Sequence, residues 1–161
     1  MIRIAEKSDE SFLYRMYMDP LINPWLLYEI MSAPDFSPIL DDLLQRNSLY
    51  IFETDGIRKG MFKLIPQKHR NSHILYLGGV AIEPASSGKG LGRQMIEELT
   101  DLAVGSGYTR IELTVATSNQ RAIHLYESCG FVNEGILRNY TYLKSEGRYI
   151  DEQVMALLLQ A

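Results

Sequence analysis

Cysteine is nearly absent from this chain of 161 residues. Cys129 is the single one, so no disulfide can form within the chain, and a zinc site built from several cysteines is excluded. The three histidines, His69, His73 and His124, lack metal-ligand spacing with one another or with Cys129. We therefore expect no bound metal. A single cysteine also fits the reducing cytoplasm, where we expect the protein to reside.

The chain also lacks long apolar runs and an excess of positive charge. No apolar run approaches the ~20 residues that span a membrane. Charged residues appear as early as Arg3 and Glu6, so we expect no signal peptide. Sixteen basic and 20 acidic residues give a net charge of −4 and a pI near 5.4, which disfavours a broad nucleic-acid surface. We expect neither nucleic acid nor membrane as a partner.

Length and composition predict one globular domain over residues 1–161. A domain of about 150 residues can bury roughly 70% of its unfolded surface. The hydrophobic fraction of 46% and the charged fraction of 22% are close to globular averages, which excludes disordered and fibrous classes. No internal repeat or low-complexity tract divides the chain.

The pattern of apolar residues predicts an α/β (α+β) domain with a mixed, largely antiparallel sheet. We predict strands at residues 2–5, 49–53, 61–65, 74–82 and 111–116, and a hairpin of 132–143 with 148–158. The strand at 74–82 is almost continuously apolar, which is typical of burial on both faces. Helices are predicted from an N-cap at Ser8 to Asp19, around 39–46, from Leu91 to a stop at Gly105, and from Asn119 to a stop at Gly130.

Two predicted helices have distinct apolar faces. The first places Leu91, Met95, Leu99 and Leu102 together, and the second places Ala122, Leu125, Tyr126 and Cys129 together. We expect both faces to be buried.

The segment 80–93 carries the strongest chemical signal. A strand runs into a loop with Gly88 and Gly90 and then directly into a helix. Glycines allow a ligand to approach the backbone, and a helix N-terminus offers free N–H groups and a partial positive charge. Lys89 and Arg93 add positive charge in an acidic chain. The segment predicts a site for phosphate or pyrophosphate; the alternative is a tight strand-to-helix turn without a ligand.

Two common phosphate motifs do not fit this loop. A Walker loop requires a glycine where this chain has Glu83, and a serine or threonine where it has Gly90. The dinucleotide motif G-x-G-x-x-G requires a third glycine where this chain has Arg93. Both nucleotide-binding interpretations are therefore excluded.

Two segments resemble the GNAT N-acetyltransferase superfamily. Residues 87–92, Ser-Gly-Lys-Gly-Leu-Gly, resemble its acyl-CoA loop, with Ser87 where arginine or glutamine is typical. Residues 119–131 are similar to its pattern N-x-x-A-x-x-L-Y-x-x-x-G-F. The resemblance implies a GNAT-like splayed sheet flanked by helices, acetyl-CoA as the donor and a primary amine as the acceptor.

The resemblance also implies a set of site residues. The acyl-CoA loop would bind the pyrophosphate, the strand backbone would bind the pantetheine amides, Asn119 would contact the pantetheine arm, and Tyr126 would protonate the leaving thiolate. The implied donor-binding residues are Val80, Ala81, Ile82, Ser87, Gly88, Lys89, Gly90, Leu91, Gly92, Arg93, Asn119 and Tyr126. The alternatives are a plain N-cap for Asn119 and a core aromatic for Tyr126.

The general base and the acceptor pocket are not assigned by the sequence. Tyr76 stands where some family members carry a catalytic glutamate, and Glu112 either faces the cleft or is a solvated or salt-bridged strand residue. Trp25, Tyr28 and Met31 either line the acceptor pocket or belong to the core.

Two functions from different classes remain at this point. The chain is interpreted as an N-acetyltransferase that acts on a small-molecule, polyamine or peptide amine by direct transfer. The alternative is a non-catalytic sensor that binds acyl-CoA. A homodimer is left open.

Overall fold

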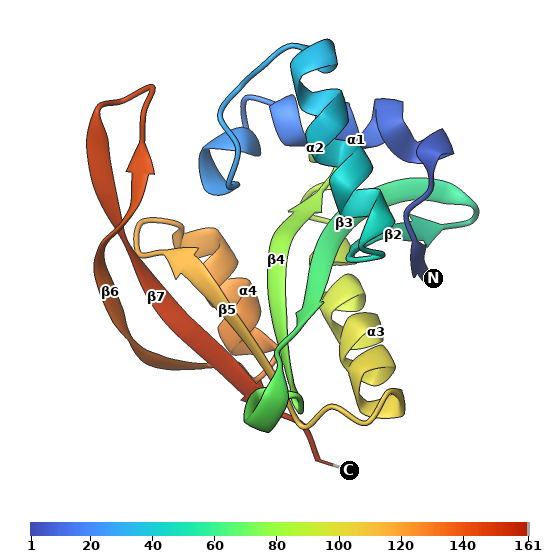
Figure 1. Ribbon diagram of the computed structural model, residues 1–161. Helices are drawn as coiled ribbons and strands as arrows, with labels where there is room; N and C mark the ends of the chain where they lie inside the picture. The colour runs from blue at the N-terminus through green and yellow to red at the C-terminus, as the bar shows by residue number, and fades with distance from the viewer. Residues whose placement is uncertain (161) are drawn as a thin grey trace. The chain divides into compact units, whose positions relative to one another are not determined.

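The computed structural model describes residues 1–160. The elements are β1 (Ile2–Ile4), α1 (Glu10–Met18), α2 (Ala33–Gln45), β2 (Leu49–Thr54), β3 (Ile57–Pro66), β4 (Ile74–Ile82), α3 (Leu91–Gly105), β5 (Arg110–Ala116), α4 (Gln120–Ser128), β6 (Val132–Leu143) and β7 (Arg148–Leu158) (Figure 1). The predicted order of strands and helices is confirmed. Within residues 1–160, no helix is both long enough and apolar enough to cross a membrane.

The strands are hydrogen-bonded in the order β1-β2-β3-β4-β5-β7-β6. The pairs β1–β2, β2–β3, β5–β7 and β6–β7 are antiparallel, and β4 pairs with β5 in parallel. The prediction of a mixed, mostly antiparallel sheet is therefore confirmed. The chain forms two compact units: an N-terminal unit of residues 1–64 and 79–95, and a C-terminal unit of residues 65–78 and those from 96 onward.

The N-terminal unit has a core of apolar residues from α1, α2 and the first strands. Tyr17 of α1 packs against Phe36 of α2 with ring centroids 5.1 Å apart, and Leu13, Leu40 and Ile51 are fully buried in the same cluster. Burial of this apolar surface is the main force that holds the two helices on the strands.

Helix α2 is longer than predicted, because it begins at Ala33 and contains both prolines of this segment. The Ser32 hydroxyl caps it by accepting a hydrogen bond from the Asp35 N–H at 3.3 Å. Pro34 lies in the first turn, where a backbone N–H has no partner within the helix, so it is tolerated. The helix predicted around residues 39–46 therefore starts earlier than expected.

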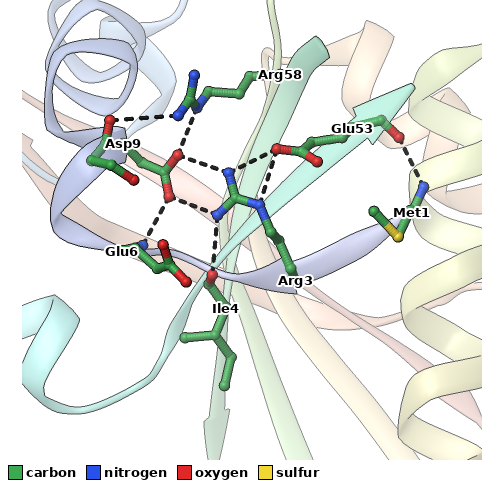
Figure 2. A network of polar contacts seen from close by, with 8 residues as sticks. Met1, Arg3, Ile4, Glu6, Asp9, Glu53 and Arg58 are labelled. Carbon is green, nitrogen blue, oxygen red and sulfur yellow. Dashed lines mark hydrogen bonds and ion pairs between the residues drawn. The ribbon is translucent and has the colours of Figure 1, made fainter. Parts of the chain in front are cut away.

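A buried carboxylate ties the first elements of this unit together (Figure 2). Asp9 accepts hydrogen bonds from Arg3 Nη1 and Nη2 at 2.8 Å, from Arg58 Nε at 2.6 Å and from the Glu6 N–H at 2.8 Å. Arg3 also binds Glu53 of β2 at 2.7 Å. Burial alone would raise the pKa of Asp9, but the hydrogen bonds from Arg3, Glu6 and Arg58 hold it well below its usual range.

This network also corrects the predicted start of the first helix. Ser8 lies inside a 3₁₀ turn of residues 7–9, and Asp9 is the N-cap residue of α1. The Asp9 side chain accepts a hydrogen bond from the Glu6 N–H as part of a reciprocal capping box. A 3₁₀ turn therefore forms where the sequence predicted the N-cap of the helix.

The C-terminal unit contains the long hairpin of β6 and β7, whose predicted bounds are confirmed (Figure 1). β5 pairs with β7 from Arg110↔Leu158 to Ala116↔Glu152. One side of this pair is apolar and buried, with Ile111 and Leu113 of β5 and Met155 of β7.

Three details of the predicted burial are wrong. In α3, Leu102 is 39% exposed while Ala103 is buried, although the helix ends at Gly105 as predicted. In α4, Ile123 and Tyr126 are buried, and Leu125 is only half-buried. In β4, burial alternates along most of the strand, so its second face is not fully covered.

Candidate active site

The loop between β4 and α3 has the open backbone that the glycines predict. After a 3₁₀ turn of residues 84–86, Gly88 and Gly90 take left-handed φ angles of +77° and +78°, and α3 begins at Leu91. Only glycine adopts this conformation at little cost. A Cβ on either glycine would meet no atom within 4 Å. The loop backbone is therefore accessible to a ligand.

The electrostatics of this loop favour an anion. The first four N–H groups of an α-helix have no partner within the helix, and its dipole places partial positive charge there. Helix α3 is 15 residues long, and exposed Lys89 and Arg93 flank its N-terminus. The Lys89 ammonium donates only a long hydrogen bond of 3.3 Å to the Ala85 carbonyl. A phosphate or pyrophosphate suits these groups.

Ser86 and Glu83 form a polar contact at the start of the loop, which the sequence did not predict. Ser86 is buried, and its hydroxyl donates to Glu83 Oε2 at 3.3 Å. The same carboxylate pairs with Lys59 Nζ at 3.6 Å, and the Glu83 N–H donates to the Lys59 carbonyl at 2.8 Å. These contacts fix the start of the loop to β3.

The strand before the loop is closely approached by β3. A Cβ on Gly60 would lie 2.8 Å from the carbonyl oxygen of Ala81, so only glycine fits there. Ala81 is buried, while Val80 and Ile82 are half-buried. The N-terminal unit thus brings the predicted residues of β4 and of the loop together: Val80, Ala81, Ile82, Ser87, Gly88, Lys89, Gly90, Leu91, Gly92 and Arg93.

The C-terminal unit holds the other two predicted residues, Asn119 and Tyr126. Asn119 is the N-cap of α4, because its side-chain oxygen accepts the Ala122 N–H at 3.2 Å. Its own N–H donates to the carbonyl of Ala116 at the end of β5. The N-cap interpretation is confirmed, and the contact with a pantetheine arm stays a prediction.

Tyr126 is a core aromatic with a protonated hydroxyl. Its side chain packs against Phe131 with ring centroids 5.7 Å apart, and the residue is only 6% exposed. Burial raises the pKa of Tyr126, and Tyr76 and Cys129 add to the increase. A phenol that stays protonated at neutral pH can donate a hydrogen bond or a proton. Its catalytic role stays a prediction.

Tyr76 faces β5 and contacts another hydroxyl. Its oxygen lies 3.3 Å from Thr114 Oγ1, and burial raises its pKa. Glu112 stands beside Tyr76 in the parallel register and is bound by Arg110, whose Nη2 lies 3.1 Å from Glu112 Oε2. The salt-bridged interpretation of Glu112 is therefore confirmed.

The other candidate residues from the sequence include the three histidines, Cys129, Tyr28 and Trp25. The three histidines are exposed, and Cys129 is half-buried. In the described part of the chain, no three histidine, cysteine or acidic side chains are grouped to hold a metal. Tyr28 packs edge-on against Tyr17 at 5.6 Å, so it belongs to the core, whereas Trp25 is half exposed.

A buried lysine escaped the sequence analysis. Lys63 of β3 is only 7% exposed, its ammonium lies 5.5 Å from the ring centroid of Tyr28, and burial lowers its pKa. Beside it, the hydroxyl of Tyr17 is buried and has no hydrogen-bond partner within residues 1–160. The signal was the single lysine inside the apolar run of residues 61–65.

A glycine-containing loop between a strand and a helix N-terminus suits the phosphates of a coenzyme. Residues 10–131 match the model of the acetyltransferase (GNAT) family. The chain belongs to this family and is an N-acetyltransferase.

Two proteins with related sequences are named as N-acetyltransferases. Spermidine N(1)-acetyltransferase of Vibrio cholerae is 26% identical over 98% of this chain and 91% of that protein. Its crystal structure with CoA and spermine has a TM-score of 0.84 and covers 99% of this chain and 95% of its own. The [ribosomal protein bS18]-alanine N-acetyltransferase of Escherichia coli K12 is 42% identical over 50% of this chain and 53% of that enzyme.

Proposed function

We propose that this enzyme moves an acetyl group directly from acetyl-CoA to a primary amine, with residues 87–93 holding the pyrophosphate. The observation that carries the proposal is the pair of left-handed glycines, Gly88 and Gly90, just before the N-terminus of α3. Their backbone is open to a ligand, and Lys89 and Arg93 supply positive charge at its edge. The backbone of Val80–Ile82 and the side chain of Asn119 would bind the pantetheine arm.

Tyr126 would act on the leaving group. The amine nitrogen forms a bond to the carbonyl carbon of the thioester, the C–S bond breaks, and the departing sulfur takes the proton of the Tyr126 hydroxyl. The excess proton on the acylated nitrogen then passes to the Tyr126 phenolate or to water. Burial keeps this hydroxyl protonated before the reaction, because it disfavours the phenolate. General acid catalysis of this kind contributes typically about 10²–10⁴-fold to a rate.

The acceptor class rests on the relatives. One relative is named for spermidine and another for the alanine of a ribosomal protein, and both acceptors carry amines. A primary amine of a small molecule, a polyamine or a peptide is therefore the proposed acceptor of this enzyme.

The test combines binding and turnover. Calorimetry with CoA and release of free thiol from acetyl-CoA would be measured with a panel of polyamines, amino acids and short peptides. We expect CoA to bind and at least one amine to accelerate thiol release. CoA binding without turnover of any amine would favour a non-catalytic sensor instead.

A charge-reversal pair tests the donor site. Lys89→Glu should weaken CoA more than a pantetheine fragment without phosphates, and the loss should shrink with salt because exposed charges are screened over about 8 Å. Lys68→Glu is the control, since it changes the net charge equally at an exposed position outside the loop. Equal effects of both variants on CoA would contradict the proposed site.

The cellular location, the domain extent and the oligomeric state of the enzyme are also proposed. We place the reaction in the reducing cytoplasm, which a chain with one cysteine suits. Residues 1–161 are proposed as a single N-acetyltransferase domain. A homodimer stays a prediction, which sedimentation analysis can test.

A further inference from the structure

One face of the C-terminal unit gathers polar side chains from three strands. Tyr76 of β4 stands beside Glu112 of β5, Thr114 stands opposite Val154 of β7, and Ala116 stands opposite Glu152. Successive side chains of a strand point to opposite faces, and directly paired residues share a face. Tyr76, Glu112, Thr114 and Glu152 therefore lie on the same face, and the 3.3 Å contact of Tyr76 with Thr114 agrees with this.

The two carboxylates on this face have different partners. Glu112 forms an ion pair with Arg110, whose Nε and Nη2 both lie 3.1 Å from Oε2, and the same guanidinium also binds Glu134. Glu152 accepts a hydrogen bond from the Thr141 hydroxyl on Oε1 at 2.9 Å. Within residues 1–160, no cationic side chain forms an ion pair with Glu152, and the residue is half-buried. Its second carboxylate oxygen has no hydrogen-bond partner within residues 1–160.

Glu152 also lies beside the elements that the proposed function places at the reactive end of the donor. Ala116, its partner on β5, accepts the N–H of Asn119, the residue proposed to contact the pantetheine arm. Burial, with a smaller contribution from the charge of Glu152, raises the pKa of Tyr76; burial, with a smaller contribution from Tyr76, raises that of Tyr126.

We propose that Glu152 is the general base that removes the proton of the acceptor amine, with Thr141 fixing its carboxylate. This inference rests on the proposed function, because it requires that an amine attack the thioester beside Tyr126. The acceptor arrives as an ammonium, R–NH₃⁺, and gives one proton to the free oxygen of Glu152, directly or through one water. The nitrogen lone pair then forms the C–N bond.

The remaining protons balance without another reactant. When the tetrahedral intermediate collapses, the C–S bond breaks and Tyr126 gives its proton to the thiolate. The nitrogen, which still carries an excess proton after attack, returns one to the Tyr126 phenolate or to water. Glu152 releases its proton to solvent once the products leave.

Glu152→Gln and Glu112→Gln form a matched pair on the same sheet face. With any accepting amine, Glu152→Gln should lower kcat by roughly 10²-fold, which is at the lower end of general-base effects. CoA affinity and the thermal midpoint should change little. Glu112→Gln should leave kcat within about twofold and lower only the thermal midpoint, because it breaks the pair with Arg110.

A comparison of two amines shows whether Glu152 acts as a base or has a structural or binding role. The best accepted amine would be compared with its β,β-difluorinated analogue, whose amine is largely neutral at the assay pH. Glu152→Gln should slow the ordinary amine strongly and the fluorinated one little, since a neutral amine needs no base. Equal slowing of both amines, or a rise in KM at unchanged kcat, would overturn the assignment.

The outcomes also separate this inference from the proposed function. If the wild-type enzyme releases thiol and Glu152→Gln releases it equally fast, Glu152 is not the base, while the acetyltransferase function stands. Absence of turnover in the wild-type enzyme with every amine would refute the function on which the inference depends.

Discussion

The guanidinium of Arg110 binds the carboxylate of Glu112, two residues further along β5, with Nε and Nη2 both 3.1 Å from Oε2. Residues i and i+2 of a strand share a face, so the pair forms within one strand. Arg110 also binds Glu134 of β6, which holds the guanidinium in place. Glu112 is thereby paired within the sheet, whereas Glu152 forms no ion pair within residues 1–160.

Tyr126→Phe tests the proposed acid. The variant should lower turnover by roughly 10- to 10³-fold, because one proton transfer or hydrogen bond in the transition state is worth about 1.4 to 4 kcal/mol. The ring still packs against Phe131, so stability and CoA affinity should change little. Single-turnover rates and thermal midpoints would be measured.

Tyr142→Phe is the control for this substitution, since it removes an exposed hydroxyl from β6. It should change neither rate nor midpoint. An unchanged rate in Tyr126→Phe would remove the residue from the mechanism, and a large fall in its midpoint would show that the hydroxyl has a structural role.

Gly90→Val tests the acyl-CoA loop. A left-handed residue with a Cβ costs roughly 1–2 kcal/mol, so the variant should lose about this much stability. Its side chain would also occupy the open side of the loop, and CoA affinity should fall by at least about tenfold, or about 1.4 kcal/mol. Calorimetry with CoA and thermal unfolding measure the two effects separately.

Gly56→Val has the same backbone strain at the turn between β2 and β3 of the same unit, outside residues 87–93. Gly56 has φ +72° and, like Gly90, no atom within 4 Å of a Cβ. It should lose similar stability and keep its CoA affinity. If both variants lost affinity equally, strain alone would explain the result and the loop would not be the phosphate site.

The sequence predicted the parts of the fold that depend on local pattern. The bounds of β4 follow from an almost continuous apolar run, those of the hairpin from its turn residues, and the cap at Asn119 from its side chain. The start of α2 was missed because Pro34 suits a first helical turn as well as a loop.

Contacts between distant segments could not be predicted in this way. Arg3 meets Glu53 and Asp9 meets Arg58, each about 50 residues further along the chain, and no local pattern encodes these pairings. Glu152 likewise becomes distinct from Glu112 only once the partners of both carboxylates are known. The candidate base therefore required the strand register.

Tyr17→Phe should stabilise the protein. The Tyr17 hydroxyl is buried without a hydrogen-bond partner in residues 1–160, and an unpaired buried polar group costs about 1–3 kcal/mol. We expect a gain of about 1 kcal/mol, or roughly 2–4 °C in the thermal midpoint for a chain of this size. Tyr14→Phe is the opposite case, since its hydroxyl donates to the Met31 carbonyl at 3.0 Å and its removal should destabilise. A lower midpoint for Tyr17→Phe would show that the hydroxyl has a partner in solution.

Asp9→Asn should destabilise the N-terminal unit by roughly 3 kcal/mol at neutral pH, because it leaves Arg3 and Arg58 without the buried carboxylate that both bind. Asp101→Asn, at an exposed position of α3, is the control and should change little. Chemical denaturation at several pH values would give both free energies of unfolding.

The pH dependence follows from the sign of the shift. The pKa of Asp9 is lower in the folded protein than the value of about 3.9 in an unfolded chain, because the hydrogen bonds from Arg3 and Arg58 outweigh the cost of burial. Its stabilising contribution is therefore complete above that unfolded value and decreases as the pH falls toward the folded one. The difference in stability between the wild type and Asp9→Asn should shrink steadily below about pH 4. A difference that stayed constant down to pH values where the wild type unfolds would mean that the loss in Asp9→Asn comes from packing, and that the charge of Asp9 adds nothing.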